Sequence, residues 1–281
     1  MTIVILVGAA LLYALGMRRV ARAGSPWPRG RAVAFYTLGL GSYAVIELGF
    51  LGTWSSELRW AFVARIALLL LAVPGFIALG RPLDLLRACL SPDARRRLDA
   101  VLDGRIFRVF GNAMFATLFA AAVFCLFLTP LAGVLRTSPV LGEAIGVVTL
   151  GAGLLLVIPM MALTGIHTST FLAIEFLLAF VELVIDSIPG ILLRLNDTIV
   201  DGITTITPGA AWWPNPLHDQ HLAGDLLWFI AEVADVPILI LLLVRWHRRD
   251  RREAASFDAL SDEEHDALVQ AHLHGTRLAD S

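Results

Sequence analysis

The stretch "WAFVARIALLLLAVPGFIALG", residues 60–80, decides the fold. It is apolar apart from Arg65, and as a helix it is long enough to cross the ~30 Å hydrocarbon core of a bilayer. Because a backbone in lipid has to satisfy its own hydrogen bonds, such a run favours a helix over an isolated strand. This stretch therefore indicates an α-helical membrane protein.

Similar apolar runs recur along the whole chain, which is 57% hydrophobic and only 16% charged. A soluble domain has roughly a quarter of its residues charged. We predict an all-α, polytopic bundle with a seven-span membrane domain at 1–247 and a tail with a short helix at 248–281. The seven spans are expected at about 2–17, 33–53, 60–80, 109–130, 143–164, 170–193 and 221–245. The first run lacks a basic segment before it and a small-residue cleavage site after it, so we expect a retained span rather than a signal peptide.

The loops between these runs alternate in charge. Arginines crowd the segments 18–32 and 81–108 and the end of the last run, whereas the opposite side holds only Arg59, Arg136 and Arg194. Because an excess of basic residues marks the cytoplasmic side, we expect the N-terminus outside and the C-terminus in the cytoplasm. The absence of lysine beside abundant Ala, Leu and Val indicates a bacterial source, and hence a multi-pass protein of the plasma (inner) membrane.

Two further helices are expected outside the spans. In the basic loop, "SPDARRRLDAVLDG" has Ser91 as an N-cap, Pro92 at the first helical position and Gly104 just past the end. In the tail, Ser261 and Gly275 bracket a second helix. A histidine pair in this tail, His272 and His274, is more typical of solvated side chains than of a metal site.

Carboxylates inside the predicted spans are the first candidate functional residues, because ionisable groups at bilayer depth are costly. They fall on common helix faces within spans six and seven. The set is Glu47, Glu175, Glu182, Asp186, Glu232 and Asp235, with Asp225 continuing the stripe in span seven. One interpretation is a polar cavity for a proton or a metal cation. The other is structural, with Arg65 pairing one acid and the rest protonated or hydrogen-bonded.

The start of the last span offers a candidate metal site. His218, His221 and Asp225 lie three and four residues apart, so one helix face can present all three, and such a set suits Cu(II) or zinc. A complete site usually needs three or four ligands. The alternative is a polar helix start, in which Asp219 caps its own helix by accepting from amides near Leu222.

Two motifs resemble those of the CtaG-like cytochrome c oxidase assembly factor family. In "DQHLAGDLLWFIAE", residues 219–232, the matching positions are Asp219, Gln220, Ala223, Gly224, Trp228 and Glu232. In "AVPGFIALGRPLDLLRACL", residues 72–90, they are Pro74, Leu79, Gly80 and Pro82. Family members usually carry a His-Met-x-x-His motif in the third span, and the matching stretch here, residues 60–68, has no histidine.

The resemblance implies a seven-span oxidase assembly factor that aids copper delivery. Its partners would be the lipid bilayer and either respiratory oxidase subunits or a copper donor protein. Two alternatives stay open: a proton- or cation-coupled transporter or channel that uses the intramembrane carboxylates, and a histidine-depleted interaction scaffold. We expect no enzymatic activity, because no nucleophile–base pair is visible, and no nucleic-acid partner. Copper is the one cofactor that the resemblance implies.

Overall fold

The computed structural model describes residues 1–110, 113–162, 169–204, 212–213 and 215–258, and helix is the only regular structure in them. The first half comprises α1 (Thr2–Arg22), α2 (Arg29–Val33), the π-helix η1 (Ala34–Leu40), α3 (Gly41–Leu48), α4 (Phe50–Trp54), α5 (Arg59–Leu79), α6 (Pro82–Cys89) and α7 (Pro92–Leu102). The second comprises α8 (Arg105–Phe110), α9 (Ala113–Cys125), the 3₁₀ turn η2 (Leu126–Leu128), α10 (Leu131–Thr137), α11 (Pro139–Ala162), α12 (Ser169–Leu195) and α13 (Pro216–Asp258). The all-α prediction is thus confirmed for the described residues.

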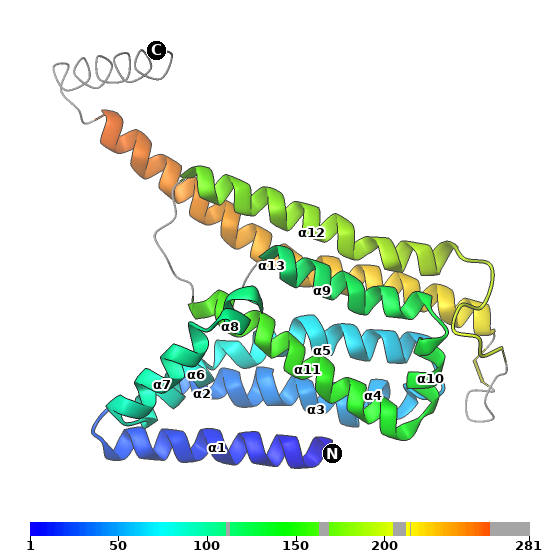
Figure 1. Ribbon diagram of the computed structural model, residues 1–281, viewed down its shortest axis with the longest axis horizontal. Coiled ribbons are helices and arrows are strands. Elements are labelled where there is room, and N and C mark those ends of the chain that lie inside the picture. The colour runs from blue at the N-terminus through cyan, green and yellow to red at the C-terminus, as the bar shows by residue number, and fades with distance from the viewer. Residues whose placement is uncertain (111–112, 163–168, 205–211, 214, 259–281) are drawn as a thin grey trace.

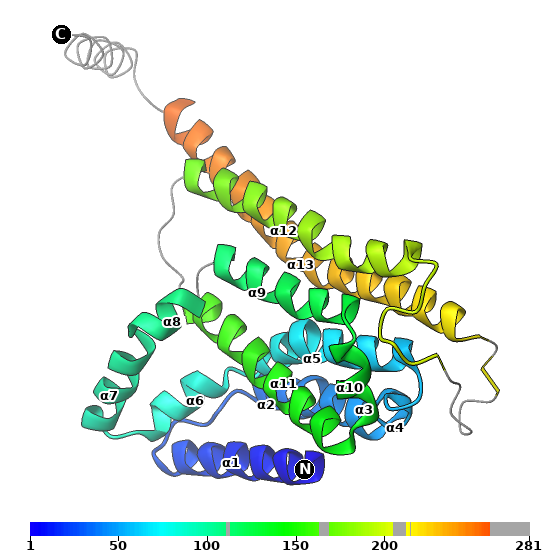
Figure 2. The same cartoon turned by 45° about the vertical axis from the view of Figure 1, so that its right-hand side comes forward.

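The long helices run side by side, with α1 on one flank and the α12–α13 pair on the other (Figure 1). Helix α5 lies between them and packs against α11, α13 and η1. The short helices gather at the two ends of the bundle. One end holds α6, α7 and α8; the other, which we call the α4–α10 end, holds α4, α10, the segment 196–204 and the first turns of α5 and α13 (Figures 1 and 2).

The core is built around α5. Its residues Phe62, Ile66 and Leu70 are almost completely buried, and they pack with Phe124 of α9 and Leu227 of α13 in one cluster. Because α5 is apolar on nearly every side, it can be packed by other helices all around in the centre of the bundle. Arg65 lies in this buried helix and needs a partner from within the protein.

In each of the seven predicted spans, most of the described residues are helical. By length and composition, four helical segments among the described residues are able to cross a membrane: Thr2–Arg22, Arg29–Trp54, Arg59–Leu79 and Pro139–Val157. A fifth arises if Phe115–Leu128 and Leu131–Thr137, which meet at 83°, form one broken span. The count of seven spans and the orientation of the termini remain predictions.

Outside the spans, the loop helix is confirmed as α7. It begins at Pro92, and the hydroxyl oxygen of Ser91 accepts a hydrogen bond from the amide of Ala94 at 3.4 Å. The expected domain boundary at 247 falls within α13, which continues without a break to Asp258. The expected tail helix from Ser261 lies outside the described residues, as do the tail histidines.

Candidate functional site

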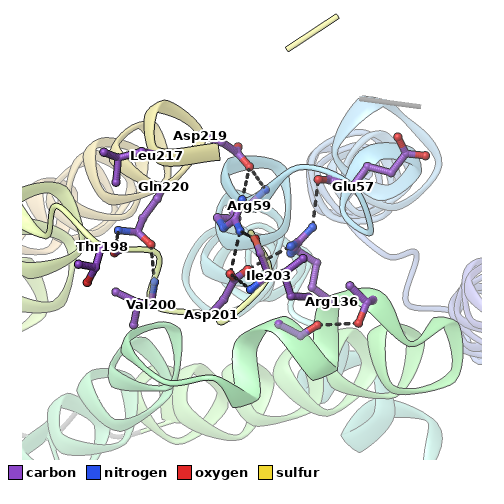
Figure 3. A network of polar contacts seen from close by, with 12 residues as sticks. Glu57, Arg59, Arg136, Thr198, Val200, Asp201, Ile203, Leu217, Asp219 and Gln220 are labelled. Atoms are coloured by element: carbon purple, nitrogen blue, oxygen red, sulfur yellow. Dashed lines mark hydrogen bonds and ion pairs between the residues drawn. The ribbon is translucent and has the colours of Figure 1, made fainter. Parts of the chain in front are cut away.

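Four charged side chains form a buried network at the α4–α10 end (Figure 3). Asp201 lies at its centre. One carboxylate oxygen of Asp201 accepts from Arg59 of α5 at 2.8 Å, and the other accepts from Arg136 of α10 at 3.0 Å. Arg59 also contacts Asp219 of α13 at 3.4 Å. Two arginines and two aspartates balance in charge, which offsets part of the cost of removing them from water.

The two arginines also satisfy backbone carbonyl groups. Arg59 donates to the carbonyl of Ile203, and Arg136 donates to the carbonyls of Ser56 and Glu57, just after α4, at 2.9 and 3.0 Å. Gly133 of α10 lies so close to the carbonyl of Asp201 that a side chain would clash with it. The network therefore fixes the segment around Asp201 against α5, α10 and the end of α4.

Asp219 caps a helix other than its own. Its carboxylate oxygens accept from the backbone amides of Arg59 at 2.8 Å and Trp60 at 3.2 Å, the first residues of α5. The prediction that it caps α13 is wrong, because α13 begins earlier, at Pro216, where the side chain of Asn215 accepts from the amide of Leu217. Helix N-termini favour negative charge, so Asp219 complements the start of α5.

The surroundings of Asp219 act on its pKa in opposite directions. Burial is the largest cause, and it raises the pKa of this carboxyl group above its ordinary value. The hydrogen bonds from the two amides and the charges of Arg59 and Arg136 lower the pKa and offset part of that rise.

Gln220 binds the neighbouring segment through its side-chain amide. Its nitrogen donates to the carbonyls of Thr198 at 2.9 Å and Asn196 at 3.3 Å, and its oxygen accepts from the amide of Val200 at 2.8 Å. The side chain is 1% exposed, so these three bonds satisfy it where water is excluded. Gln220 thus holds the residues that lead to Asp201.

Gly224, Trp228 and Glu232 complete the motif along α13. Gly224 lies where α13 crosses α12, and a methyl group there would lie 2.6 Å from the carbonyl oxygen of Gly190. Only glycine permits so close an approach of two helix backbones. Trp228 points outward on α13, and its indole donates to Glu232 one turn further on.

The three predicted metal ligands have separate partners. The His218 ring lies 5.8 Å from the Trp213 ring, His221 Nε2 lies 3.2 Å from the carbonyl oxygen of Asn196, and Asp225 pairs with Arg194 at 3.0 Å. Among the residues that the structure describes, no three His, Cys, Asp or Glu side chains gather as a metal-binding group. As they are placed, these donors do not form a copper site.

Of the six predicted intramembrane acids, the structure describes the side chains of Glu47, Asp186 and Glu232. Both oxygens of Glu47 in α3 accept from Arg65 of α5 at 2.9 Å, and Thr2 of α1 donates to the same carboxylate at 3.2 Å. Asp186 of α12 is buried. The side chains of Glu175, Glu182 and Asp235 lie outside the described residues.

Aromatic side chains cover the α4–α10 end beside the network. Trp54 and Trp60 both lie against Phe50, at centroid distances of 5.8 and 5.3 Å, and both contact the pair Trp212–Trp213. We call Phe50, Trp54, Trp60, Trp212 and Trp213 the aromatic cluster. Trp212 and Phe50 are the more exposed members. Beside the network, a cavity of about 20 Å³, lined by Arg59, Arg136 and Gln220 among others, has room for one water molecule and none for a substrate.

Sequence reasoning did not single out Asp201, the centre of the network. One signal was available: Arg59, Arg136 and Arg194 are the few arginines of the side predicted to be outer, and each of them pairs with an aspartate. A sparse set of arginines on a side whose other charged residues are acidic indicates structural ion pairs. The sequence shows no property of Asp201 that sets it apart from the neighbouring Asp197.

Comparison with known proteins adds to this geometry. A family model described as cytochrome c oxidase caa3 assembly factor (Caa3_CtaG) matches residues 11–249. The uncharacterized protein MT0111 of Mycobacterium tuberculosis is 24% identical over 264 residues, which cover 91% of this chain and 40% of the relative. The uncharacterized protein ML1998 of Mycobacterium leprae is 24% identical over 261 residues, 89% of this chain and 39% of the relative. The chain thus spans about two fifths of the length of these curated relatives.

No solved structure matches the chain. The family model covers most of the sequence, including all of α5 and the motif of α13 that builds the network. The chain therefore belongs to the Caa3_CtaG family of cytochrome c oxidase caa3 assembly factors.

Proposed function

We propose that this protein acts in the plasma membrane as an assembly factor for cytochrome c oxidase, and that it works by binding an oxidase component rather than by turning over a substrate. The α4–α10 end supports this proposal. There the buried Arg59–Asp201–Arg136 network fixes a segment whose neighbours display exposed aromatic side chains. A rigid aromatic surface is typical of a protein-binding site, because aromatic anchors lose little conformational freedom on binding.

The proposal includes the seven-span topology, with the α4–α10 end outside and the α6–α8 end in the cytoplasm. The arginine distribution of the sequence supports this orientation. The protein would then bind the oxidase component at the outer side of the membrane.

Copper delivery is the finer form of the proposal, with copper as cargo. It requires His218, His221 and Asp225 to exchange Trp213, the Asn196 carbonyl and Arg194 for the ion. This form expects the purified protein to take up copper that the His218→Ala/His221→Ala variant does not. Equal uptake by the two proteins would remove the copper step and leave the binding role.

The experiment that tests the assembly role is deletion of the gene in its own bacterium. We expect oxidase activity and assembled oxidase in membranes to fall several-fold while transcripts of the oxidase genes stay constant. Complementation with wild type should restore both, and a Trp212→Ala/Phe50→Ala variant, which changes only exposed members of the aromatic cluster, should restore less. Unchanged oxidase in the deletion strain would contradict the proposal.

A further inference from the structure

The side of α13 that faces away from the bundle carries carboxylates, whereas the described outward-facing side chains of α1 (3–15) and α12 (177–192) are apolar. The buried side of α13 is formed by Gln220, Ala223, Leu227 and Ala231. The opposite side is a stripe at helical spacing, which we call the α13 outer face: Asp225, Trp228, Phe229, Glu232 and Val236. All of its members are exposed except Glu232, which is partly buried.

Glu232 is the unusual member of this face. On the predicted span 221–245 it lies about 16 Å from the start, near the middle of a ~30 Å hydrocarbon core. The Trp228 indole donates one hydrogen bond to it. A carboxylate has about four acceptor positions, so one donor leaves most of them unused. Asp225, nearer the end of the span, is by contrast neutralised by Arg194.

The other outward-facing helices differ from α13. The exposed residues of α1 between Ile3 and Leu15 are all apolar. The exposed residues of α12 from Leu177 to Leu192 are apolar as well, among the side chains that the structure describes. Both surfaces suit lipid, whereas a carboxylate at mid-depth beside lipid is costly. The α13 outer face is therefore unsuited to lipid in a way that these described outward-facing side chains of α1 and α12 are not.

We propose that the α13 outer face docks a transmembrane helix of a different membrane protein, one that offers a hydrogen-bond-donating side chain to Glu232 at mid-depth. Charge complementarity supports a donor, because a carboxylate only accepts. The exposed Trp228, Phe229 and Val236 supply the apolar area around that contact. The inference rests on the proposed function, since an assembly factor in the membrane needs a membrane-embedded partner.

A second copy of this chain fits the face poorly. If the α13 outer face were the interface of a symmetric dimer, its two copies would be related by a two-fold axis along the membrane normal, and equivalent residues would lie at the same depth. The two Glu232 side chains would then come together. Two carboxylates repel each other in a medium of low dielectric constant, and neither supplies the missing donor.

Photocrosslinking in native membranes tests the inference with a matched pair of positions. Benzoylphenylalanine replaces Phe229 on the α13 outer face or Phe180 on α12, which are 62% and 51% exposed. We expect position 229 to crosslink an apolar transmembrane segment of another protein at least tenfold more than position 180. Mass spectrometry should place a donor residue in that segment. Glu232→Leu should lower the yield at 229 at least fivefold at equal protein abundance, and Glu232→Gln, which keeps an acceptor oxygen, should lower it less.

Three results would overturn the inference: equal yields at the two positions, crosslinks to a second copy of this chain, or a yield at 229 that Glu232→Leu leaves unchanged. If the Glu232→Leu variant does not accumulate, the inference is tested by comparing the crosslink yields at positions 229 and 180 in protein that keeps Glu232. Oxidase activity in the deletion strain separates the two proposals. Low activity with no specific crosslink refutes the docking face alone, whereas normal activity with a specific crosslink refutes the assembly role alone.

Discussion

Asp219 caps the helix that begins at Arg59, 160 residues earlier in the chain, by accepting its backbone amide hydrogen bond at 2.8 Å. The same carboxylate pairs with the Arg59 guanidinium group at 3.4 Å. One side chain of α13 thus fixes both the start of α5 and the arginine that holds Asp201. This explains physically why an aspartate suits this position of the family motif: it orders three segments that are distant in sequence.

Replacing Asp219 should therefore destabilise the protein more than a typical helix cap would. Asp219→Ala removes the cap, worth about 1 kcal/mol, and also leaves Arg59 with only one of its two aspartates. We expect the midpoint of thermal unfolding in detergent to fall clearly in Asp219→Ala. It should fall less in Asp219→Asn, which keeps an acceptor oxygen. Asp225→Ala is the control: its pair with Arg194 is half-exposed, and its loss should have a smaller effect. Equal losses for Asp219→Ala and Asp225→Ala would argue against the cap.

The charges of the network should be coupled. Arg136→Met leaves Asp201 with one arginine, and Asp201→Asn removes the aspartate that pairs with Arg136; each change should cost about 3–5 kcal/mol because it leaves the buried network with one uncompensated charge. The double variant removes one positive and one negative charge and keeps the Arg59–Asp219 pair. We expect it to be much more stable than the sum of the single losses implies, as a double-mutant cycle of unfolding free energies measures. Additive losses would show that the two side chains act independently.

Gln220 should hold the segment 196–200 in place rather than take part in copper binding. Gln220→Leu keeps a buried side chain of similar size but removes all three bonds to the segment 196–200. We expect faster amide hydrogen exchange at Thr198 and Val200, together with cleavage near Asp197 by protease added to purified protein. His221→Ala, which loses one contact with Asn196, is the matched control. The amides of Thr198 and Val200 in this variant should exchange at nearly the wild-type rate. Identical exchange rates at Thr198 and Val200 in Gln220→Leu and wild type would show that Gln220 does not hold this segment in place.

The sequence predicted the helices well, because membrane spans depend on length and apolar composition alone. Residues 60–80 could be predicted as a long apolar helix, which the structure shows as α5, and the Ser91 cap of α7 could be read from local spacing. The bipartite helix pair Phe115–Leu128 and Leu131–Thr137 shows the limit of this approach. Its 83° bend follows Thr129 and Pro130, a local feature that a hydropathy window averages away.

The site was predicted less well, because partners distant in sequence cannot be inferred from spacing along one helix. His218, His221 and Asp225 have the spacing of a metal site, yet each lies against a different residue. Glu47 and Arg65 were recognised as intramembrane charges, and the structure pairs them with each other. Asp219 was expected to serve its own helix because a cap is normally judged from neighbouring residues; here the amides that it binds belong to α5.

The orientation of the bundle gives the last prediction. In a background in which Cys89 and Cys125 are replaced by serine, Asp197→Cys places a thiol at an exposed position of the α4–α10 end, and Ala100→Cys places one on exposed α7 at the opposite end. If the arginine-rich side is cytoplasmic, a membrane-impermeant maleimide should label Asp197→Cys in intact cells with a permeabilised outer envelope. Ala100→Cys should be labelled only after the plasma membrane is disrupted. The reverse pattern would invert the predicted topology and move the aromatic cluster to the cytoplasmic side. Labelling of both thiols in intact cells would indicate that the two ends of the bundle are not separated by the membrane at all.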